Sequence, residues 1–160
     1  MRLLLDSHVF LWMHVSPDRL SSGTRELLAD AEPSVLLSVV TPWELGIKVA
    51  SKKLKLPESL EDYVLTRVQL ARMALLPIEL RHVIESASLP AHHGDPFDRM
   101  LIAQARVEEL TVVTADPWFS RYDVSAGARP PPHMPMLAHE TENPSIRFGW
   151  SSSGISKDFR

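Results

Sequence analysis

Three short apolar runs stand out along the chain, and polar or turn-forming residues bound each of them. The runs cover residues 2–5, 35–40 and 111–114. Continuous apolar runs of this length are typical of strands that are buried on both faces of a sheet. The pattern therefore predicts three central strands.

Between these runs, apolar residues recur at helical spacing. The predicted helices cover residues 22–31, 42–52, 59–74, 79–88 and 96–109. Strands that alternate with helices favour a parallel sheet covered by helices on both faces, so we expect an α/β fold. A chain of 160 residues, 44% of them hydrophobic, is long enough for one compact domain with a substantial core.

The composition changes after about Val124. Residues 125–160 are rich in proline and serine and show little apolar periodicity. Such composition is typical of extended or disordered segments. We therefore predict a folded domain over residues 1–124 and an irregular tail over residues 125–160 with no catalytic role.

Acidic residues fall where the predicted strands end. Asp6 ends the first strand, Glu44 lies in the first turn after the second, and Asp116 follows the third. Asp95 and Asp98 open the helix that leads into the third strand. Because ligand sites in open α/β sheets form beyond the carboxyl ends of the strands, we expect these five carboxylates to converge at one edge of the sheet.

Helix capping is the alternative interpretation of the same acids. Residues 41–44 (TPWE) match a capping box, with Thr41 as the N-cap and Glu44 at the third helical position. Asp95 and Asp116 each precede a proline in the same way. Asp6 ends an apolar strand instead, and we expect it to be half-buried without a capping role.

Electrostatic repulsion favours a metal site over a set of independent caps. Two carboxylates about 4 Å apart repel by about 4 kcal/mol at an effective dielectric near 20. A cluster of them therefore needs bound protons or a cation. The chain has no cysteine, and hard oxygen ligands favour Mg²⁺ or Mn²⁺ over zinc.

Several other classes of protein lack their signatures in this chain. There is no dinucleotide-binding glycine fingerprint, no P-loop and no G-x-S-x-G nucleophile elbow. The formal net charge of −3 provides no overall basic surface, so a nucleic-acid enzyme would need a local basic patch or bound cations. No apolar stretch approaches the ~18 residues of a membrane span. The lack of cysteine suits a reducing compartment, and we expect a cytoplasmic protein.

Five segments carry a resemblance to a known family. They are residues 3–8 (LLLDSH), 43–48 (WELGIK), 53–56 (KLKL), 93–105 (HGDPFDRMLIAQA) and 114–116 (TAD). Their order and spacing resemble those of PIN domains and, more narrowly, of VapC-like toxin ribonucleases of type II toxin–antitoxin pairs. The resemblance covers residues 2–124, whereas the tail departs from the family pattern.

The resemblance implies a three-layer α/β/α sandwich with a short parallel sheet, and Mg²⁺- or Mn²⁺-dependent endonuclease action on RNA. It places Asp6, Glu44, Asp98 and Asp116 in the catalytic, metal-binding set. Asp95 is the less certain ligand. The family also implies a cognate antitoxin as partner and pairing of the toxin into a homodimer.

Two other functions remain open on the sequence alone. One is a PIN-like module that binds RNA or protein without cutting. The other is a DNA nuclease or a phosphatase that uses the same acids.

Basic residues near the acids are weak candidates for contacts with RNA: Lys48, Lys52, Lys53 and Arg99. Each has a plainer alternative. Lys48 can pair with Glu44 four residues earlier, the next two lysines can form a solvated helix end, and Arg99 can pair with Asp95.

Histidines and tryptophans near the acids have plainer roles as well. We expect the histidines to pack or form hydrogen bonds rather than bind metal: His8, His92 and His93. We expect the tryptophans in the core or in an interface rather than stacked on bases: Trp12, Trp43 and Trp118.

Overall fold

A computed structural model describes residues 1–31, 34–92, 94–124 and 126–127 of the chain. Within these ranges, five parallel strands form one sheet in the order β3-β2-β1-β4-β5. The strands are β1 (Leu3–Leu5), β2 (Val35–Ser38), β3 (Ala74–Leu76), β4 (Thr111–Val113) and β5 (Ala126–Gly127). The three predicted central strands are confirmed. The edge strands β3 and β5 are additions to that prediction.

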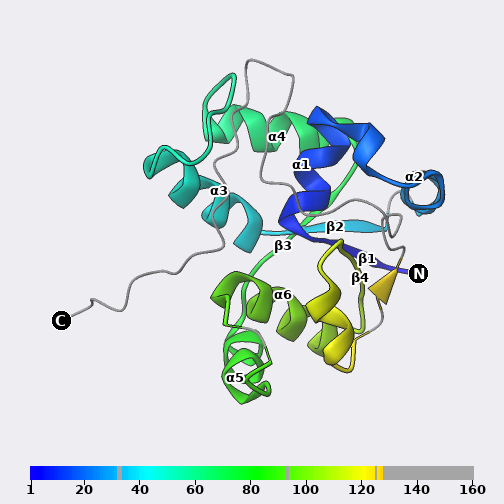
Figure 1. The fold of residues 1–160 in the computed structure, drawn as a ribbon, viewed down its shortest axis with the longest axis vertical. Coiled ribbons are helices and arrows are strands. Elements are labelled where there is room, and N and C mark those ends of the chain that lie inside the picture. Colours follow the sequence, from blue (N-terminus) through cyan, green and yellow to red (C-terminus); the bar gives the residue numbers. More distant parts are fainter. Residues whose placement is uncertain (32–33, 93, 125, 128–160) are drawn as a thin grey trace.

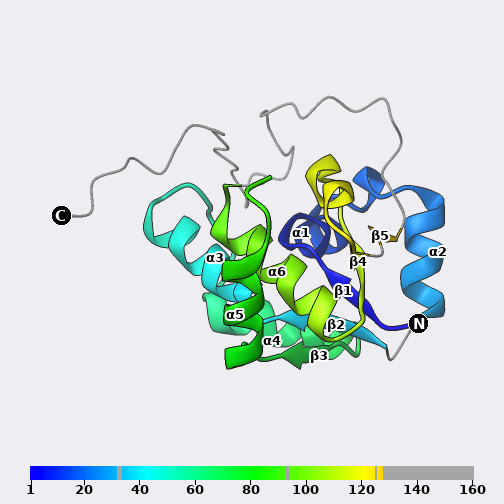
Figure 2. The same ribbon diagram turned by 90° about the horizontal axis from the view of Figure 1, so that it is seen from below.

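Helices cover both faces of the sheet, so the predicted α/β sandwich is confirmed (Figure 1). The α-helices are α1 (Ser7–Val15), α2 (Ser22–Asp30), α3 (Val40–Ala50), α4 (Leu60–Leu70), α5 (Leu80–Ser88) and α6 (Pro96–Val107). Two short 3₁₀ helices, η1 (Pro17–Arg19) and η2 (Pro117–Arg121), follow α1 and β4. Figure 2 shows the same layers from below. Helix α1 and strand β3 were not among the predicted elements.

Strand β1 shows how three residues bury two faces. Leu3 and Leu5 lie in one hydrophobic cluster, while Leu4 lies in the other, and all three are fully buried. Because successive side chains of a strand point to opposite faces, the uninterrupted leucine run is what a doubly covered strand requires.

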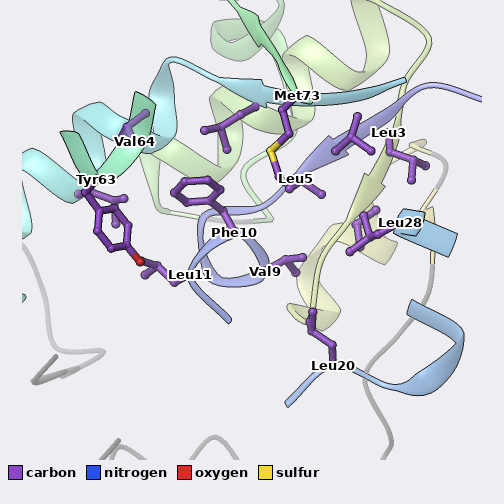
Figure 3. Close-up of a cluster of buried hydrophobic side chains, with 14 of the residues drawn as sticks. Leu3, Leu5, Val9, Phe10, Leu11, Leu20, Leu28, Tyr63, Val64 and Met73 are labelled. Carbon is purple, nitrogen blue, oxygen red and sulfur yellow. The ribbon is translucent and has the colours of Figure 1, made fainter. Parts of the chain in front are cut away.

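The two clusters correspond to the two helical layers. One contains side chains of α1 and α4, among them Phe10 and Tyr63 (Figure 3). The other contains residues of α6 and of the segment after β4, among them Ile102 and Phe119. Burial of these side chains stabilises the packing of each helical layer on the sheet, at roughly 1.5–3 kcal/mol for a large apolar side chain.

In three helices, the second residue after the last helical one has a positive φ and is not glycine. Lys52, Arg72 and Glu109 have φ values of 58°, 49° and 54°. In each case the following backbone N–H donates to a carbonyl five residues earlier; Met73 N–H, for example, donates to Val68 C=O at 2.9 Å. This is the Schellman arrangement, which normally has glycine at the left-handed position. The sequence predicted that these helices extend to residues 52, 74 and 109, which is two to four residues too far, because no glycine marks their ends.

Among the described residues, no helix is long and apolar enough to cross a membrane. Residues 126–127 of the predicted irregular tail form β5, which pairs with β4 at the edge of the sheet. The rest of that tail, residue 125 and residues 128–160, lies outside the described part of the chain. The domain boundary at residue 124 therefore stays a prediction.

Replacing Arg72 by glycine should stabilise the fold. A left-handed conformation costs an L-residue about 1–2 kcal/mol, and the greater freedom of glycine in the unfolded chain offsets part of the gain. We expect Arg72→Gly to be more stable than Arg72→Ala by about 0.5–1 kcal/mol. Urea unfolding of both variants measures the difference. Equal stability would mean that the left-handed residue carries no strain.

His14 gives the fold an acid-sensitive contact. Its ring packs edge-on against Phe10, with centroids 5.3 Å apart, and burial together with the charge of Arg67 lowers its pKa to about 4. Since the unfolded value is near 6.5, the unfolded chain binds this proton first, and stability is lost as the pH falls from about 6.5 to 4. His14→Phe should flatten the dependence of Tm on pH in this window. An unchanged slope would assign the acid sensitivity to other groups.

Candidate metal-binding and catalytic site

The acidic site lies at the point where the strand order reverses. The chain passes from β1 to β2 and β3 in one direction and then returns to the other side of β1 with β4 and β5. The carboxyl ends of β1 and β4 are therefore adjacent, which is where ligand sites form in open parallel sheets. Asp6 follows β1 directly, and Asp116 begins η2 after β4.

Asp6 is buried and caps helix α1. It is 2% exposed, and its Oδ1 accepts the backbone N–H of His8 at 3.3 Å. The hydroxyl of Thr114 donates to Oδ2 at 2.7 Å. The expectation that Asp6 is half-buried and has no capping role was therefore wrong, because the sequence pattern did not reveal a helix starting at Ser7.

The surroundings of Asp6 favour its ionised form. Burial opposes ionisation, but hydrogen bonds from His8 and Thr114 and the proximity of the His8 ring hold the pKa below its usual value. The His8 Nδ1 lies 3.6 Å from Asp6 Oδ1. His8 thus has a hydrogen-bonding role, as expected from the sequence.

Thr114 contacts two acids of the site, and the sequence analysis did not assign it a role. Besides binding Asp6, its Oγ1 accepts the backbone N–H of Asp116 at 3.0 Å, so one hydroxyl links two site acids. The Thr-x-Asp spacing is the local signal, since threonine often binds a backbone N–H two residues on.

Glu44 lies inside helix α3 and not in the capping box that the sequence predicted. Helix α3 begins at Val40, whose N–H donates to the Ser38 hydroxyl at 3.0 Å. Thr41 therefore lies inside the helix, and the predicted capping box over residues 41–44 was wrong. Glu44 is buried, at 7% exposure, and forms an ion pair with Lys48 one turn later.

Asp95 and Asp116 are N-caps, in agreement with the capping alternative. Asp95 Oδ1 accepts the N–H groups of Phe97 (2.8 Å) and Asp98 (3.4 Å) at the start of α6. Asp116 Oδ1 accepts the N–H of Trp118 at 2.8 Å. Each of these two residues therefore caps a helix and also belongs to the acidic site.

Asp98, in the first turn of α6, brings the predicted acids into one electrostatic cluster. Its pKa is raised to about 9, first by burial and then by the negative charges of Asp6, Asp95, Glu44 and Asp116. The five predicted acids are therefore close enough to influence the ionisation of one carboxyl group. We call this set the acidic cluster.

The composition of the acidic cluster fits a hard divalent cation. Its donors are carboxylate oxygens, and a cation would favour the ionised form of Asp98, which burial and the neighbouring negative charges now oppose. No three His, Cys, Asp or Glu side chains of the described residues are close enough to hold a metal ion as they stand. Coordination would therefore require side-chain movements within the cluster.

Two of the four basic candidates have defined side-chain partners in the structure. Lys48 is bound to Glu44. Arg99 donates to the carbonyls of Pro90 (2.8 Å), Ser86 (2.8 Å) and Leu89 (2.9 Å), and so binds the C-terminal end of α5. Lys52 and Lys53 are exposed beyond α3. A contact between any of these four and RNA stays a prediction.

The aromatic candidates divide into two groups. Trp12 packs against the core, as expected, whereas Trp43 and Trp118 are 55% and 40% exposed and so lie outside it. The His92 ring packs against Tyr122, with centroids 5.3 Å apart. His93 lies outside the described residues.

Solved structures with the same fold come from bacterial protein complexes. A chain of the DNA-bound VapBC complex of Salmonella typhimurium matches with a TM-score of 0.58 and 17% identity, over 79% of this chain and 96% of that chain. A chain of FitAcB from Neisseria gonorrhoeae matches with a TM-score of 0.56 and 23% identity, over 78% and 95%. A chain of VapBC-1 from nontypeable Haemophilus influenzae matches with a TM-score of 0.55 and 18% identity, over 80% of this chain and 98% of that chain. At these low sequence identities, the structural matches show likeness of fold alone.

Sequence comparison with curated proteins gave no match. The family model of the PIN domain, in contrast, matches residues 3–125, which is more than three quarters of the chain. That range contains all five strand-end and helix-start acids described above. The chain therefore belongs to the PIN domain family.

Proposed function

We propose that this chain is a metal-dependent endoribonuclease and the toxin of a toxin–antitoxin pair. The observation that carries the proposal is the acidic cluster, in which burial and then the negative charges of four other carboxylates raise the pKa of Asp98. Membership of the PIN domain family and the likeness in fold to VapBC and FitAcB chains support it.

In this proposal Asp6 and Asp98 hold the main Mg²⁺ or Mn²⁺ ion, and Glu44 and Asp116 assist them. Asp95 is the less certain ligand, because its Oδ1 already accepts two backbone N–H groups of α6. A bound divalent cation would supply Lewis-acid stabilisation of the charge that develops on the phosphodiester.

The chain's own residues orient and balance this site. The Thr114 hydroxyl and the His8 N–H fix both oxygens of Asp6, so that its carboxylate is ionised and held in one orientation. Lys48 fixes Glu44 and supplies a positive charge beside the cluster. These contacts prepare the acids for a cation and for attack by water on an RNA phosphate.

Exposed apolar side chains support the proposed protein partners, an antitoxin and a second copy of the chain. Helix α5 exposes Leu80, Val83 and Ile84 at helical spacing, and α3 exposes Trp43 and Ile47. Such faces are typical of surfaces that a protein partner covers. We retain the cytoplasm as the predicted location.

Asp6→Asn should abolish RNA cleavage and leave the fold intact. The Oδ1 of asparagine can still cap α1, and its amide NH₂ group can donate to the Thr114 hydroxyl, but asparagine lacks the negative charge that a cation requires. We expect cleavage of structured RNA in Mn²⁺ or Mg²⁺ to fall by at least about 100-fold. The exposed acid Glu61→Gln is the control and should cleave normally. Undiminished cleavage by Asp6→Asn, purified free of host nucleases, would remove Asp6 from the site.

The same assay separates the alternative functions. The purified chain is incubated with structured RNA, DNA and a generic phosphomonoester, each with Mn²⁺, Mg²⁺ or EDTA. Cleavage of RNA that EDTA abolishes supports a ribonuclease. Hydrolysis of only DNA or the monoester would replace it with the corresponding enzyme, and hydrolysis of none would favour a binding module.

Asp98→Asn should stabilise the metal-free protein. At neutral pH the unfolded chain ionises Asp98 while the folded chain keeps it protonated, so this residue lowers stability increasingly as the pH rises from about 4 to about 9. We expect a higher Tm in EDTA, at about 2–4 °C for each kcal/mol gained. Added Mn²⁺ should raise the Tm of the wild type and not that of the variant. A lower Tm of the variant in EDTA would contradict the raised pKa of Asp98.

A further inference from the structure

An exposed aromatic–cation pair lies at one border of the acidic cluster. It is formed by Trp118 and Arg121 of η2, the short helix that Asp116 caps. The Arg121 Cζ lies 4.1 Å from the centroid of the Trp118 ring, and the backbone N–H of Trp118 donates to Asp116 Oδ1 at 2.8 Å. The indole is 40% exposed. A large π surface and a guanidinium are thus fixed two to five residues from a site acid.

Among the described residues, two other arginines lie over aromatic rings. In both of these pairs the ring is part of the core or packs against it. Arg67 lies over Tyr63, which is fully buried, and pairs with Glu58 at 2.5 Å. Arg19 lies over Trp12, which packs against the core. Neither ring has the exposure of Trp118.

Trp43 is also exposed and neighbours a site acid, but its surroundings differ. Its ring packs edge-on against Phe97, at 5.1 Å between centroids, and Ile47 is exposed one turn later on the same helix. This surface is apolar, which suits a protein contact better than a nucleotide. Trp43 therefore serves as the matched control for Trp118.

Arg121 also differs in its contacts from two other cations near the acids, Lys48 and Arg99. Lys48 is bound to Glu44, and Arg99 donates to three carbonyls at the end of α5. The Arg121 side chain lies on an exposed ring, and no salt bridge to it occurs between residues that the structure describes. A guanidinium in this setting can contact a phosphate while the ring restricts its orientation.

We propose that Trp118 and Arg121 form the binding site for one unpaired nucleotide next to the cleaved bond of the RNA. The base stacks on the exposed surface of the pair, and the Arg121 guanidinium binds the adjoining phosphate. Stacking on an aromatic side chain accepts any base, so this site positions the RNA and does not read its sequence. The inference rests on the proposed ribonuclease function, and it adds binding residues that contact no metal.

The test combines variants of the protein with abasic RNA. A single-stranded oligonucleotide, and a set in which one nucleotide near the cleavage site lacks its base, are cleaved by the wild type, Trp118→Ala, Trp118→Phe and Trp43→Ala. We expect Trp118→Ala to lower kcat/KM about 10-fold, chiefly through KM, because stacking forms before the reaction. Trp118→Phe should recover most of the loss, and Trp43→Ala should resemble the wild type.

Removing the stacked base from the RNA should lower kcat/KM of the wild type about 10-fold, as Trp118→Ala does. The same abasic RNA should lower kcat/KM of Trp118→Ala little further. Non-additivity of this kind identifies an interaction between the two groups. Arg121→Ala should raise KM for intact and abasic RNA alike. Full activity of Trp118→Ala, or equal losses with every abasic substrate, would overturn the proposal.

A second measurement separates this proposal from the ribonuclease function itself. Binding of fluorescent RNA to Asp6→Asn, with and without Trp118→Ala, is followed by anisotropy in EDTA. If the wild type cleaves no RNA but Trp118→Ala still weakens binding about 10-fold, the nucleotide site holds and the nuclease function fails. If Trp118→Ala alters only self-association, the pair belongs to a protein interface and the proposal is wrong.

Discussion

Repulsion between carboxylates that are held close together is the constraint around which this domain is arranged. Burial and the charges of its neighbours raise the pKa of Asp98 to about 9, so the folded chain holds a proton that an exposed aspartate would release. Three helices, α1, α6 and η2, begin at acids of the cluster and direct their N-terminal N–H groups towards them. The partial positive charge of a helix N-terminus favours an adjacent carboxylate. The sheet brings these helix starts together, and their N–H groups offset part of the repulsion that results.

Capping and metal binding are therefore compatible demands on the same residues. The sequence suggested both and treated Asp6 as the acid that fits capping least, yet Asp6 caps α1 and is the most buried aspartate of the cluster. The signal for that cap was hidden, because residues 7–15 continue the apolar character of the first strand without a clear helical period. Glu44, assigned to a capping box, lies in the second turn of a helix that starts earlier and is fixed by Lys48.

The central strands could be predicted because each is a short apolar run that has to be buried on both faces. The edge of the sheet could not be predicted in this way. Residues of β3 are largely exposed, and in the sequence they continue the apolar pattern of the preceding helix. Strand β5 has only two residues and is defined by its pairing with β4. Helix ends were placed too late where Lys52, Arg72 and Glu109 adopt the left-handed conformation, since the usual glycine signal is missing.

Cations were the least predictable part of the site, because a charge in the sequence does not identify its partner. Arg99 lies one residue after Asp98, and proximity alone suggested either an ion pair or a phosphate contact. Its guanidinium donates to carbonyls of Ser86, Leu89 and Pro90, which α5 and the following turn bring beside α6. Such a contact exists only once both helices are packed. Arg99 therefore joins two helices in the folded chain, a role that its position in the sequence does not reveal, and its contact with RNA stays a prediction.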